Sequence, residues 1–298
     1  MIDYKEVIKN RELRLKLIYL LRFIPTEPYL KLVYRIKMGK KLNLEHPITF
    51  SEKLQWLKIH DVHPEYTKLV DKYEVRNHIA KTIGEEHLIP LLGVWDSFDE
   101  INFDELPNQF VLKCTHDSGS VKIINKDNMD LKYLKHFFKG RLRFNGYPFS
   151  REYPYKNVTP RIIAEAYMQD STTNDFRDYK FHCFDGKIVM LEVVLNRLSQ
   201  EEEKTNDFFD SEFNHLDITE YPCPHAGITP QKPEKFELMK RIAELLSSGK
   251  PYVRIDLYEA NGVVYFGEFT FFESGGYIFY QPEHWNTDLG DLLVLSNE

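Results

Sequence analysis

The sequence predicts an α+β protein in which a helical N-terminal region precedes a larger unit rich in antiparallel strands. Apolar residues recur at helical spacing between residues 3 and 45, whereas short apolar runs typical of strands dominate from about residue 89 onward. The dipeptides Asp185-Gly186 and Asn261-Gly262 indicate tight hairpins, because both residue types tolerate positive φ. We therefore divide the chain into a basic helical region, 1–65, and an α+β unit, 66–298.

The composition is that of a globular protein, with 42% hydrophobic and 29% charged residues. A net charge of −7 argues against a nucleic-acid partner. The 3 cysteines predict no disulfide framework, and no pair of them has the spacing of metal ligands. The polar start of the sequence lacks the apolar segment of a signal peptide, so we expect a cytoplasmic protein.

The first fifty residues are basic, with eleven Lys or Arg against five Asp or Glu. Two interpretations stay open: the favoured one packs the apolar face of these helices on the rest of the protein, and the other lays the segment on an anionic membrane surface. The helices are expected to break at Pro25 and Pro28. The apolar stretch Leu15–Ile24 is too short and too charged to span a bilayer.

Helix signals continue after this segment. The hydroxyl of Thr49 or Ser51 is suited to cap the helix that follows it. One further helix is expected from about Tyr66 to Ile83, ending at Gly84, a residue type that favours the left-handed helix end.

Beyond that helix, strands alternate with few helices. A short apolar run covers Ile89–Val94, a helix is expected over Glu234–Leu246, and the polar region 199–232 is the best candidate for a long mobile loop. The expected strands are Phe110–Lys113, Ile162–Glu165, Tyr179–Phe184, Ile188–Leu195, Tyr252–Leu257 and Val263–Phe271.

A lysine, Lys113, ends one apolar strand and precedes a loop of small polar residues. Hydroxyls and closely spaced N–H groups of Ser118, Gly119 and Ser120 are suited to phosphate oxygens, which the lysine can also reach. The glycine spacing is not that of a Walker A loop. Taken alone, the segment favours an ordinary turn beside a lysine that reaches solvent.

The last expected hairpin combines charged and apolar residues. Strand alternation places Arg254 and Asp256 on one face, and Glu268 and Thr270 on one face of the partner strand. Charges on apolar strands are costly in a core unless an ion or an opposite charge neutralises them. Binding of Mg²⁺ by the carboxylates is the favoured interpretation, and a solvent-facing set of cross-strand ion pairs is the alternative.

Two more strands carry ionisable residues. Glu165 ends an apolar strand and is suited to accept hydrogen bonds from an adenine amine or from ribose hydroxyls. Asp178 and Lys180 share one face of the next strand, so Lys180 either binds phosphate or pairs with Asp178. Both interpretations stay open.

In this order the motifs resemble the ATP-grasp superfamily, and within it the TupA-like (teichuronopeptide biosynthesis) ATP-grasp family. The resemblance runs from about residue 45 to near the end of the chain. It implies an ATP-grasp fold in 66–298, with the nucleotide held between two α+β subdomains. The segments that carry it are Thr49-Phe-Ser-Glu-Lys-Leu-Gln-Trp56, Asp71-Lys72-Tyr73, Phe110-Val-Leu-Lys113, Asp178-Tyr-Lys180 and Phe266-Gly-Glu-Phe-Thr270.

The resemblance also implies roles in binding ATP. Lys113 would hold the α- and β-phosphates, and the loop 115–120 would close over them. Glu165 would lie at the adenine, Asp178 at the ribose and Lys180 at the phosphates.

Further roles concern the reaction and the metal. Arg254 would stabilise the transferring phosphoryl group, and Arg197 would contact an acyl phosphate. Asp256 and Glu268 would bind Mg²⁺. Many relatives have Asn where this chain has Thr270, and a hydroxyl is a poorer metal ligand than an amide oxygen, so the third ligand is in doubt.

The activity implied is ADP-forming ligation of a carboxylate to an amine through an acyl phosphate. The substrates implied are an amino acid or other amine and an acidic surface glycan or its precursor, handled at the inner face of the membrane. Three alternatives remain: a kinase, a sugar transferase acting on surface polysaccharide, and an ATP-binding module without activity. The sequence has no Asp-x-Asp motif at the expected metal site, which counts against the transferase.

Overall fold

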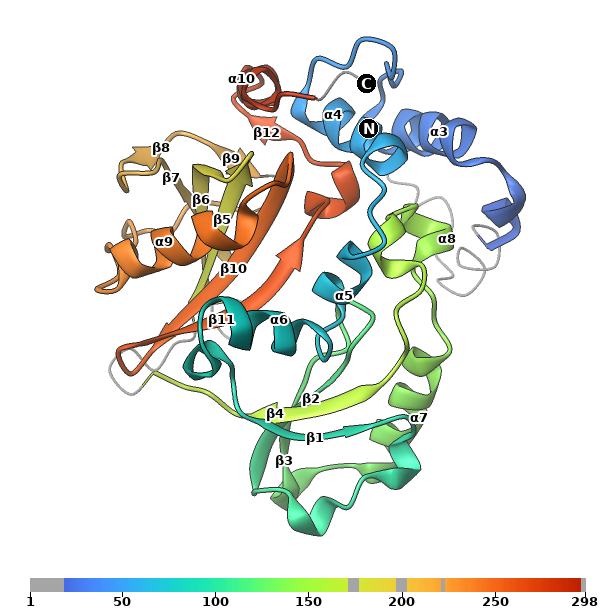
Figure 1. The fold of residues 1–298 in the computed structure, drawn as a ribbon, viewed down its shortest axis with the longest axis vertical. Helices are drawn as coiled ribbons and strands as arrows, with labels where there is room; N and C mark the ends of the chain where they lie inside the picture. Colours follow the sequence, from blue (N-terminus) through green and yellow to red (C-terminus); the bar gives the residue numbers. More distant parts are fainter. Residues whose placement is uncertain (1–18, 171–176, 197–202, 221–222, 296–298) are drawn as a thin grey trace.

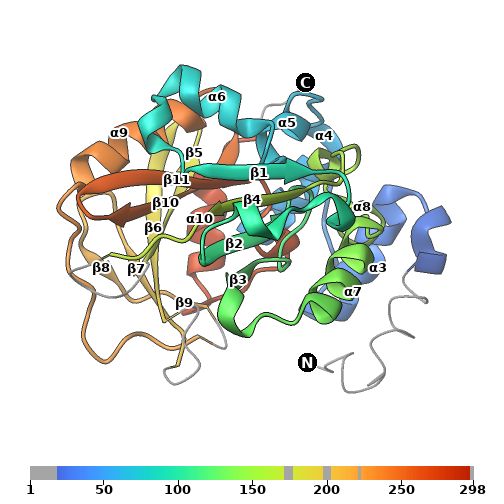
Figure 2. The same ribbon diagram turned by 90° about the horizontal axis from the view of Figure 1, so that it is seen from below.

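A computed structural model describes residues 19–170, 177–196, 203–220 and 223–295. The described chain forms two lobes, each built on an antiparallel sheet (Figures 1 and 2). Helices α3 and α4 lie beside the larger lobe, away from the smaller sheet (Figure 1). No helix among the described residues combines the length and the apolar character needed to cross a membrane.

The smaller lobe is a sheet covered on one face by helix α7, Leu131–Leu142. Strand alternation points Phe110 and Leu112 of β2 into the apolar core against α7, so that Lys113 projects from the opposite face. The strands, in spatial order, are β1 (Leu91–Trp95), β4 (Ile162–Ala166), β2 (Gln109–Cys114) and β3 (Lys122–Asn125).

The larger lobe has a sheet with helix α9, Phe236–Ser247, packed on one face. The core on that face includes Phe181 and Phe236, whose ring centroids are 6.3 Å apart. The strands, in spatial order, are β11 (Val263–Thr270), β10 (Tyr252–Ala260), β5 (Asp178–Phe184), β6 (Lys187–Leu195), β7 (Thr205–Phe209) and β8 (His215–Leu216).

Both predicted hairpin turns are confirmed. Asp185 and Gly186 have φ values of 48° and 76° between β5 and β6. Asn261 and Gly262 have φ values of 52° and 76° between β10 and β11. Two successive residues with positive φ match the twist of the flanking strands, which is why the sequence signal is reliable.

The N-terminal helices differ from the prediction at one proline. Helix α3 runs from Thr26 to Met38, so Pro28 lies inside its first turn and does not break it. The first turn has no carbonyl partners for its N–H groups, so proline loses no hydrogen bond there. Helix α4, Phe50–His60, begins with the predicted cap: the Thr49 hydroxyl accepts from the Glu52 N–H, and the Glu52 carboxylate accepts from the Thr49 N–H.

The single helix predicted from Tyr66 to Ile83 is wrong, because the structure has two. Helix α5 covers Tyr66–Val70 and α6 covers Val75–Thr82. The Asp71 carboxylate accepts hydrogen bonds from the N–H groups of Tyr73 at 2.8 Å and Glu74 at 3.2 Å. A short acidic side chain that bonds the next N–H groups competes with the helix, so the chain turns here.

The region 199–232 was predicted as a mobile loop, but its described part contains three strands that belong to sheets. Strands β7 and β8 extend the larger sheet, and β9, Thr219–Glu220, pairs with β12, Tyr280–Gln281. Phe208 and Phe209 are fully buried, which fixes this polar segment to the core.

The remaining short elements connect these parts. Lys53 of α4 donates hydrogen bonds to the carbonyls of Gly290 and Leu293 at the end of α10, so α4 contacts the C-terminal helix. The boundary between residues 65 and 66 stays a prediction. The short elements are η1 (Leu21–Phe23), η2 (Glu85–His87), η3 (Phe98–Glu100), η4 (Phe103–Glu105), η5 (Lys126–Asn128), α8 (Tyr147–Ser150), η6 (Tyr153–Tyr155), η7 (Glu273–Gly276) and α10 (Trp285–Leu292).

Candidate active site

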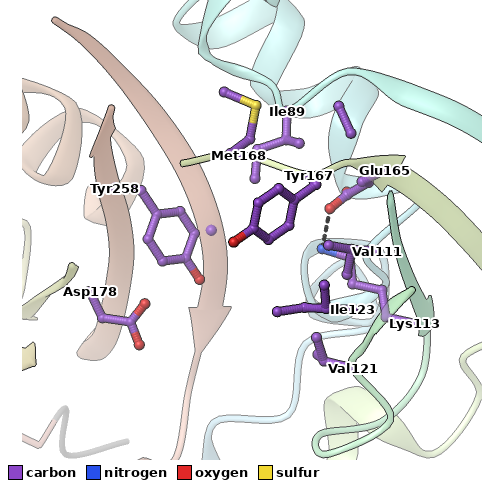
Figure 3. Close-up of a pocket in the computed structure, with 12 residues that line it drawn as sticks. Ile89, Val111, Lys113, Val121, Ile123, Glu165, Tyr167, Met168, Asp178 and Tyr258 are labelled. Carbon is purple, nitrogen blue, oxygen red and sulfur yellow. Dashed lines mark ion pairs between the residues drawn. The ribbon is translucent and has the colours of Figure 1, made fainter. Parts of the chain in front are cut away.

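A pocket of about 170 Å³ lies between the two sheets, with walls from both (Figure 3). Its lining is mostly apolar, which suits a flat heterocycle, and a few ionisable groups lie around it. The lining residues are Ile89, Val111, Lys113, Val121, Ile123, Glu165, Ala166, Tyr167, Met168, Asp178, Tyr258 and Gly267.

The smaller sheet supplies an ion pair to the pocket. Val111 pairs with Glu165 in the register of β2 and β4, so Glu165 projects from the same face as Lys113. The Lys113 Nζ lies 2.5 Å from a Glu165 carboxylate oxygen (Figure 3), and the Arg76 guanidinium lies 3.4 Å from the other oxygen. Glu165 is therefore held between two cations, and Arg76 was not predicted.

The larger sheet supplies Tyr258 and Asp178, which face each other in the register of β10 and β5. Figure 3 shows the rings of Tyr167 and Tyr258 side by side across the pocket. A Cβ at Gly267 would lie 2.8 Å from the Tyr258 ring, so this glycine leaves the space that the ring occupies. Tyr167, which follows β4 of the smaller sheet, therefore lines the same pocket as Tyr258 and Asp178 of the larger sheet.

The loop 115–120 is held by its own hydrogen bonds and by helix α7. Ser120 is buried: its hydroxyl donates to the Asp117 carboxylate and accepts from the Cys114 N–H at 2.8 Å. Arg141 donates to the Asp117 carboxylate and to the Ser118 carbonyl. Gly119 has φ of 86°, and no atom lies within 4 Å of the Cβ that another residue would add, so the loop tip is open.

Lys72 connects this loop with the larger sheet. Its Nζ donates to the Asp117 carbonyl at 2.8 Å and lies 3.7 Å from a Glu268 carboxylate oxygen. Its backbone N–H donates to the Thr115 carbonyl at 3.1 Å. Sequence reasoning gave Lys72 no role, although it lies in a quoted motif.

A row of charged side chains crosses four strands of the larger sheet. Asp256 of β10 is paired with Glu268 of β11 on one side and with Lys180 of β5 on the other. Lys180 is in turn paired with Glu192 of β6, and its Nζ lies 3.1 Å from both Glu192 carboxylate oxygens. We call Glu268, Asp256, Lys180 and Glu192 the charged row. Lys180 therefore pairs with Glu192 across the sheet, an acid that the sequence analysis missed.

Arg254 joins the acids of this face. Its guanidinium donates to both carboxylate oxygens of Asp256 at 2.6 Å and contacts Glu273 in η7. A Glu268 oxygen lies 3.4 Å from it. Thr270 faces Arg254 in the strand register, and its hydroxyl lies 3.5 Å from Glu268. The sequence analysis also missed Glu273. This residue lies in η7, beyond the end of β11, where strand alternation no longer indicates which way a side chain points.

Burial and neighbouring charges shift the pKa values of Asp256 and Lys180. Burial raises the pKa of Asp256 to about 7; Arg254 opposes this rise and Glu268 adds to it. Burial by itself would lower the pKa of Lys180, but the Glu192 carboxylate leaves it above its ordinary value. Two carboxylates on neighbouring strands of one face are suited to a divalent cation with oxygen ligands. Asp256 and Glu268 thus fit Mg²⁺.

The structure brings together most residues that the sequence singled out. Arg197 lies outside the described residues. Within the described part, the nucleotide candidates Lys113, Glu165 and Asp178 line the pocket, and Ser118, Gly119 and Ser120 form the neighbouring loop. The larger sheet gathers Lys180, Arg254, Asp256, Glu268 and Thr270 on one face.

These features are those of an ATP-grasp fold, in which two α+β lobes enclose a nucleotide site. A family model described as TupA-like ATPgrasp matches residues 52–294. The chain belongs to the TupA-like ATP-grasp family, as its motifs predicted.

Solved structures with a related fold include two ligases. D-alanine–D-alanine ligase from Bacillus anthracis is 17% identical, with 68% of this chain and 56% of that chain covered at a TM-score of 0.41. L-amino acid ligase from Bacillus licheniformis is 13% identical, with 91% and 61% covered at a TM-score of 0.46. The chain thus spans less than two thirds of either ligase. Among curated proteins, none matches the sequence.

The buried pair of Lys180 and Glu192 gives a stability prediction. Lys180→Met or Glu192→Leu alone should lower the free energy of unfolding by about 3–5 kcal/mol, because each leaves an uncompensated buried charge. The free energy of unfolding of the double variant should fall by much less than the sum of the losses in the two single variants. Guanidinium titration of all four proteins measures the coupling.

The exposed pair Glu27 and Lys31, 2.6 Å apart in α3, is the matched control. The corresponding changes Glu27→Leu and Lys31→Met should couple by less than about 1 kcal/mol, because exposed ion pairs are weak. Additive losses at Lys180 and Glu192 would show that the two charges do not compensate each other.

Proposed function

We propose that the protein is an ATP- and Mg²⁺-dependent ligase that joins a carboxylate to an amine and releases ADP and phosphate. The observation that carries this proposal is the position of the apolar pocket. It adjoins the sheet face that carries the charged row and Arg254. A nucleotide base in the pocket would direct its phosphates toward that face.

Each of the pocket residues would contact a different part of ATP. The apolar walls would receive adenine, and Glu165 would accept from its amine. Lys113 would meet the α- and β-phosphates, with the N–H groups and hydroxyls of the loop 115–120, Ser118 and Gly119 among them, closing over them. Asp178, at the rim formed by the larger sheet, would accept from ribose hydroxyls.

Asp256 and Glu268 would hold Mg²⁺, with Thr270 as a weaker third oxygen ligand. The ion, when bound, offsets the negative charge of the phosphates. Arg254 and Lys180 are fixed cations on the same face, so they would stabilise charge as the phosphoryl group moves to the substrate carboxylate. Arg197 is proposed to contact the resulting acyl phosphate, which the amine then attacks with loss of phosphate.

ATP binding tests the site directly. Lys113→Ala, Asp256→Asn and Glu268→Gln should each weaken Mg²⁺-dependent ATP binding by about tenfold or more, since charge-assisted contacts contribute roughly 1.5–3 kcal/mol. Isothermal titration calorimetry with and without Mg²⁺ measures this. Lys132→Ala, on the exposed side of α7, and Glu237→Gln, on the exposed side of α9, are controls that should bind normally. Binding of a UDP-sugar in place of ATP would favour the transferase.

The proposed substrates are an amino acid or other amine and an acidic cell-surface polysaccharide or its precursor. The support is the family, whose name refers to teichuronopeptide biosynthesis. A polysaccharide or sugar kinase with the same nucleotide site is the second candidate, because a metal and fixed cations serve phosphoryl transfer to a hydroxyl equally well.

Turnover separates these activities. With a uronic-acid polymer as carboxylate donor and a set of amino acids, ADP release should require both substrates and should stop when the polymer's carboxylates are reduced to alcohols. ADP release from ATP in the presence of the polymer alone, without any amine and unaffected by reduction of the carboxylates, would identify a kinase. ATP binding with no ADP release from any pair would indicate a binding module.

The N-terminal surface supports the proposed location at the inner membrane face. Tyr29, Leu30 and Tyr34 of α3 are buried, so one face of this helix packs on the protein as the favoured interpretation predicted. Leu20 and Phe23, however, are 64% and 76% exposed beside Arg22. Exposed apolar groups next to cations suit an anionic lipid surface.

Vesicle sedimentation tests this location. Leu20→Ser with Phe23→Ser should reduce binding to vesicles that contain anionic lipid by several-fold, with ATP binding unchanged. Ile228→Ser is the control, because Ile228 is 87% exposed outside the basic segment. Equal sedimentation of the wild type, the double variant and Ile228→Ser would show that this surface does not bind the membrane.

A further inference from the structure

The outer edge of the larger sheet carries a second group of metal-ligand side chains, outside the pocket. Asp207 comes from β7, His215 from β8 and His225 from the segment that follows β9. One ligand atom of each lies within 4.8 Å of the others. None of the three has a part in the proposed ligase reaction.

The sheet separates this group from the charged row. Asn206 of β7 donates to Glu192 at 2.7 Å, so it projects toward the charged row. Asp207 follows Asn206 and therefore projects from the opposite face. The two groups of side chains therefore lie on opposite faces of the sheet.

Asp207 is a buried carboxylate that contacts two different segments. It is 1% exposed, and its Oδ1 lies 2.9 Å from the Nε2 of His215. Its Oδ2 accepts the Ala226 N–H at 3.0 Å, which leaves Oδ1 directed at the imidazole. A buried carboxylate and an imidazole nitrogen are two of the ligand types that bind transition-metal ions such as zinc.

The hydrogen bonding of His225 sets its tautomer. Its Nε2 lies 2.7 Å from the Ile218 carbonyl oxygen, which can only accept, so Nε2 carries the proton. In the neutral imidazole, the Nδ1 then has the free electron pair. Histidines that bind metals commonly donate their other N–H to a carbonyl in this way. The two imidazole centroids are only 5.0 Å apart.

We propose that Asp207, His215 and His225 bind a divalent transition-metal ion of the zinc class. The ligand atoms are the Asp207 Oδ1, the His215 Nε2 and the His225 Nδ1, with water in a fourth position. To bind the ion, a neutral His215 carries its proton on Nδ1 in place of Nε2, a change of tautomer that exchange with solvent allows, and the ion takes the place of the hydrogen between Nε2 and the Asp207 Oδ1. Two imidazoles favour zinc over magnesium, which prefers oxygen ligands.

Such an ion would fasten the β7–β8 hairpin to the segment after β9. That segment already contacts β7, because the Asn206 N–H donates to the Pro224 carbonyl at 3.0 Å. A ligand that binds only the folded state raises thermal stability by mass action. Zinc should therefore raise the unfolding temperature of the protein as well as bind to it.

Zinc binding to the full chain, made without a polyhistidine tag and stripped with a chelator, tests this proposal. A fluorescent zinc indicator should report one equivalent bound by the wild type and by Asp256→Asn. His225→Gln and Asp207→Asn should lower the zinc affinity by at least about tenfold. Cobalt(II) in place of zinc should give the visible absorption of a four-coordinate site in the wild type and in Asp256→Asn, but not in His225→Gln or Asp207→Asn.

His284→Gln is the matched control. His284 lies 2.8 Å from the Asp288 carboxylate, an imidazole–carboxylate pair on the surface of α10 that belongs to no group of three among the described residues. It should leave zinc binding unchanged. The thermal midpoint without metal checks that His225→Gln is folded, so that the proposal can be judged even if Asp207→Asn is not.

Two results would overturn the site. One is a wild-type protein that neither binds zinc at micromolar concentration nor gains thermal stability from it. The other is zinc binding that survives both His225→Gln and Asp207→Asn. Either result would mean that these three residues only hold the segments together by hydrogen bonds.

Discussion

Neutralisation of buried charge on the larger sheet is the constraint on which the candidate site depends. Four neighbouring strands each place an ionisable side chain in one row, and Arg254 and Glu273 extend it. Such groups are tolerated inside a protein only when their charges compensate each other and their hydrogen bonds are made. The strand register therefore has to hold, because a slip of one residue would turn every one of these side chains to the face that packs on α9.

The two lobes are joined at this face through a few polar contacts. Lys72 reaches both the loop after β2 and Glu268, and it is placed there by the turn at Asp71. A continuous helix from residue 66 to 83 would carry Lys72 elsewhere. The break in the helix is thus part of the site, which explains why a capping acid occurs at a position where a helix former would give more local stability.

The surroundings of Asp256 connect stability with the proposed activity. Its pKa of about 7 reflects the cost of burying a carboxylate next to Glu268, and Arg254 offsets part of that cost. A divalent cation would offset more. Pre-placed charges of this kind need little rearrangement during phosphoryl transfer, which is the physical reason that a rigid sheet suits the reaction we propose.

The sequence by itself determined six of the strands (β2, β4, β5, β6, β10 and β11), the two hairpin turns, the helix cap at Thr49 and the family, because these depend on residues close together in the chain. It also indicated which strands carry ionisable side chains. Only the tertiary structure decided which charges meet: Lys180 pairs with Glu192, Glu165 lies between Lys113 and Arg76, and Asp207 lies beside two histidines. Strand order and lobe packing bring these groups together from distant parts of the chain, and neither periodicity nor spacing encodes them.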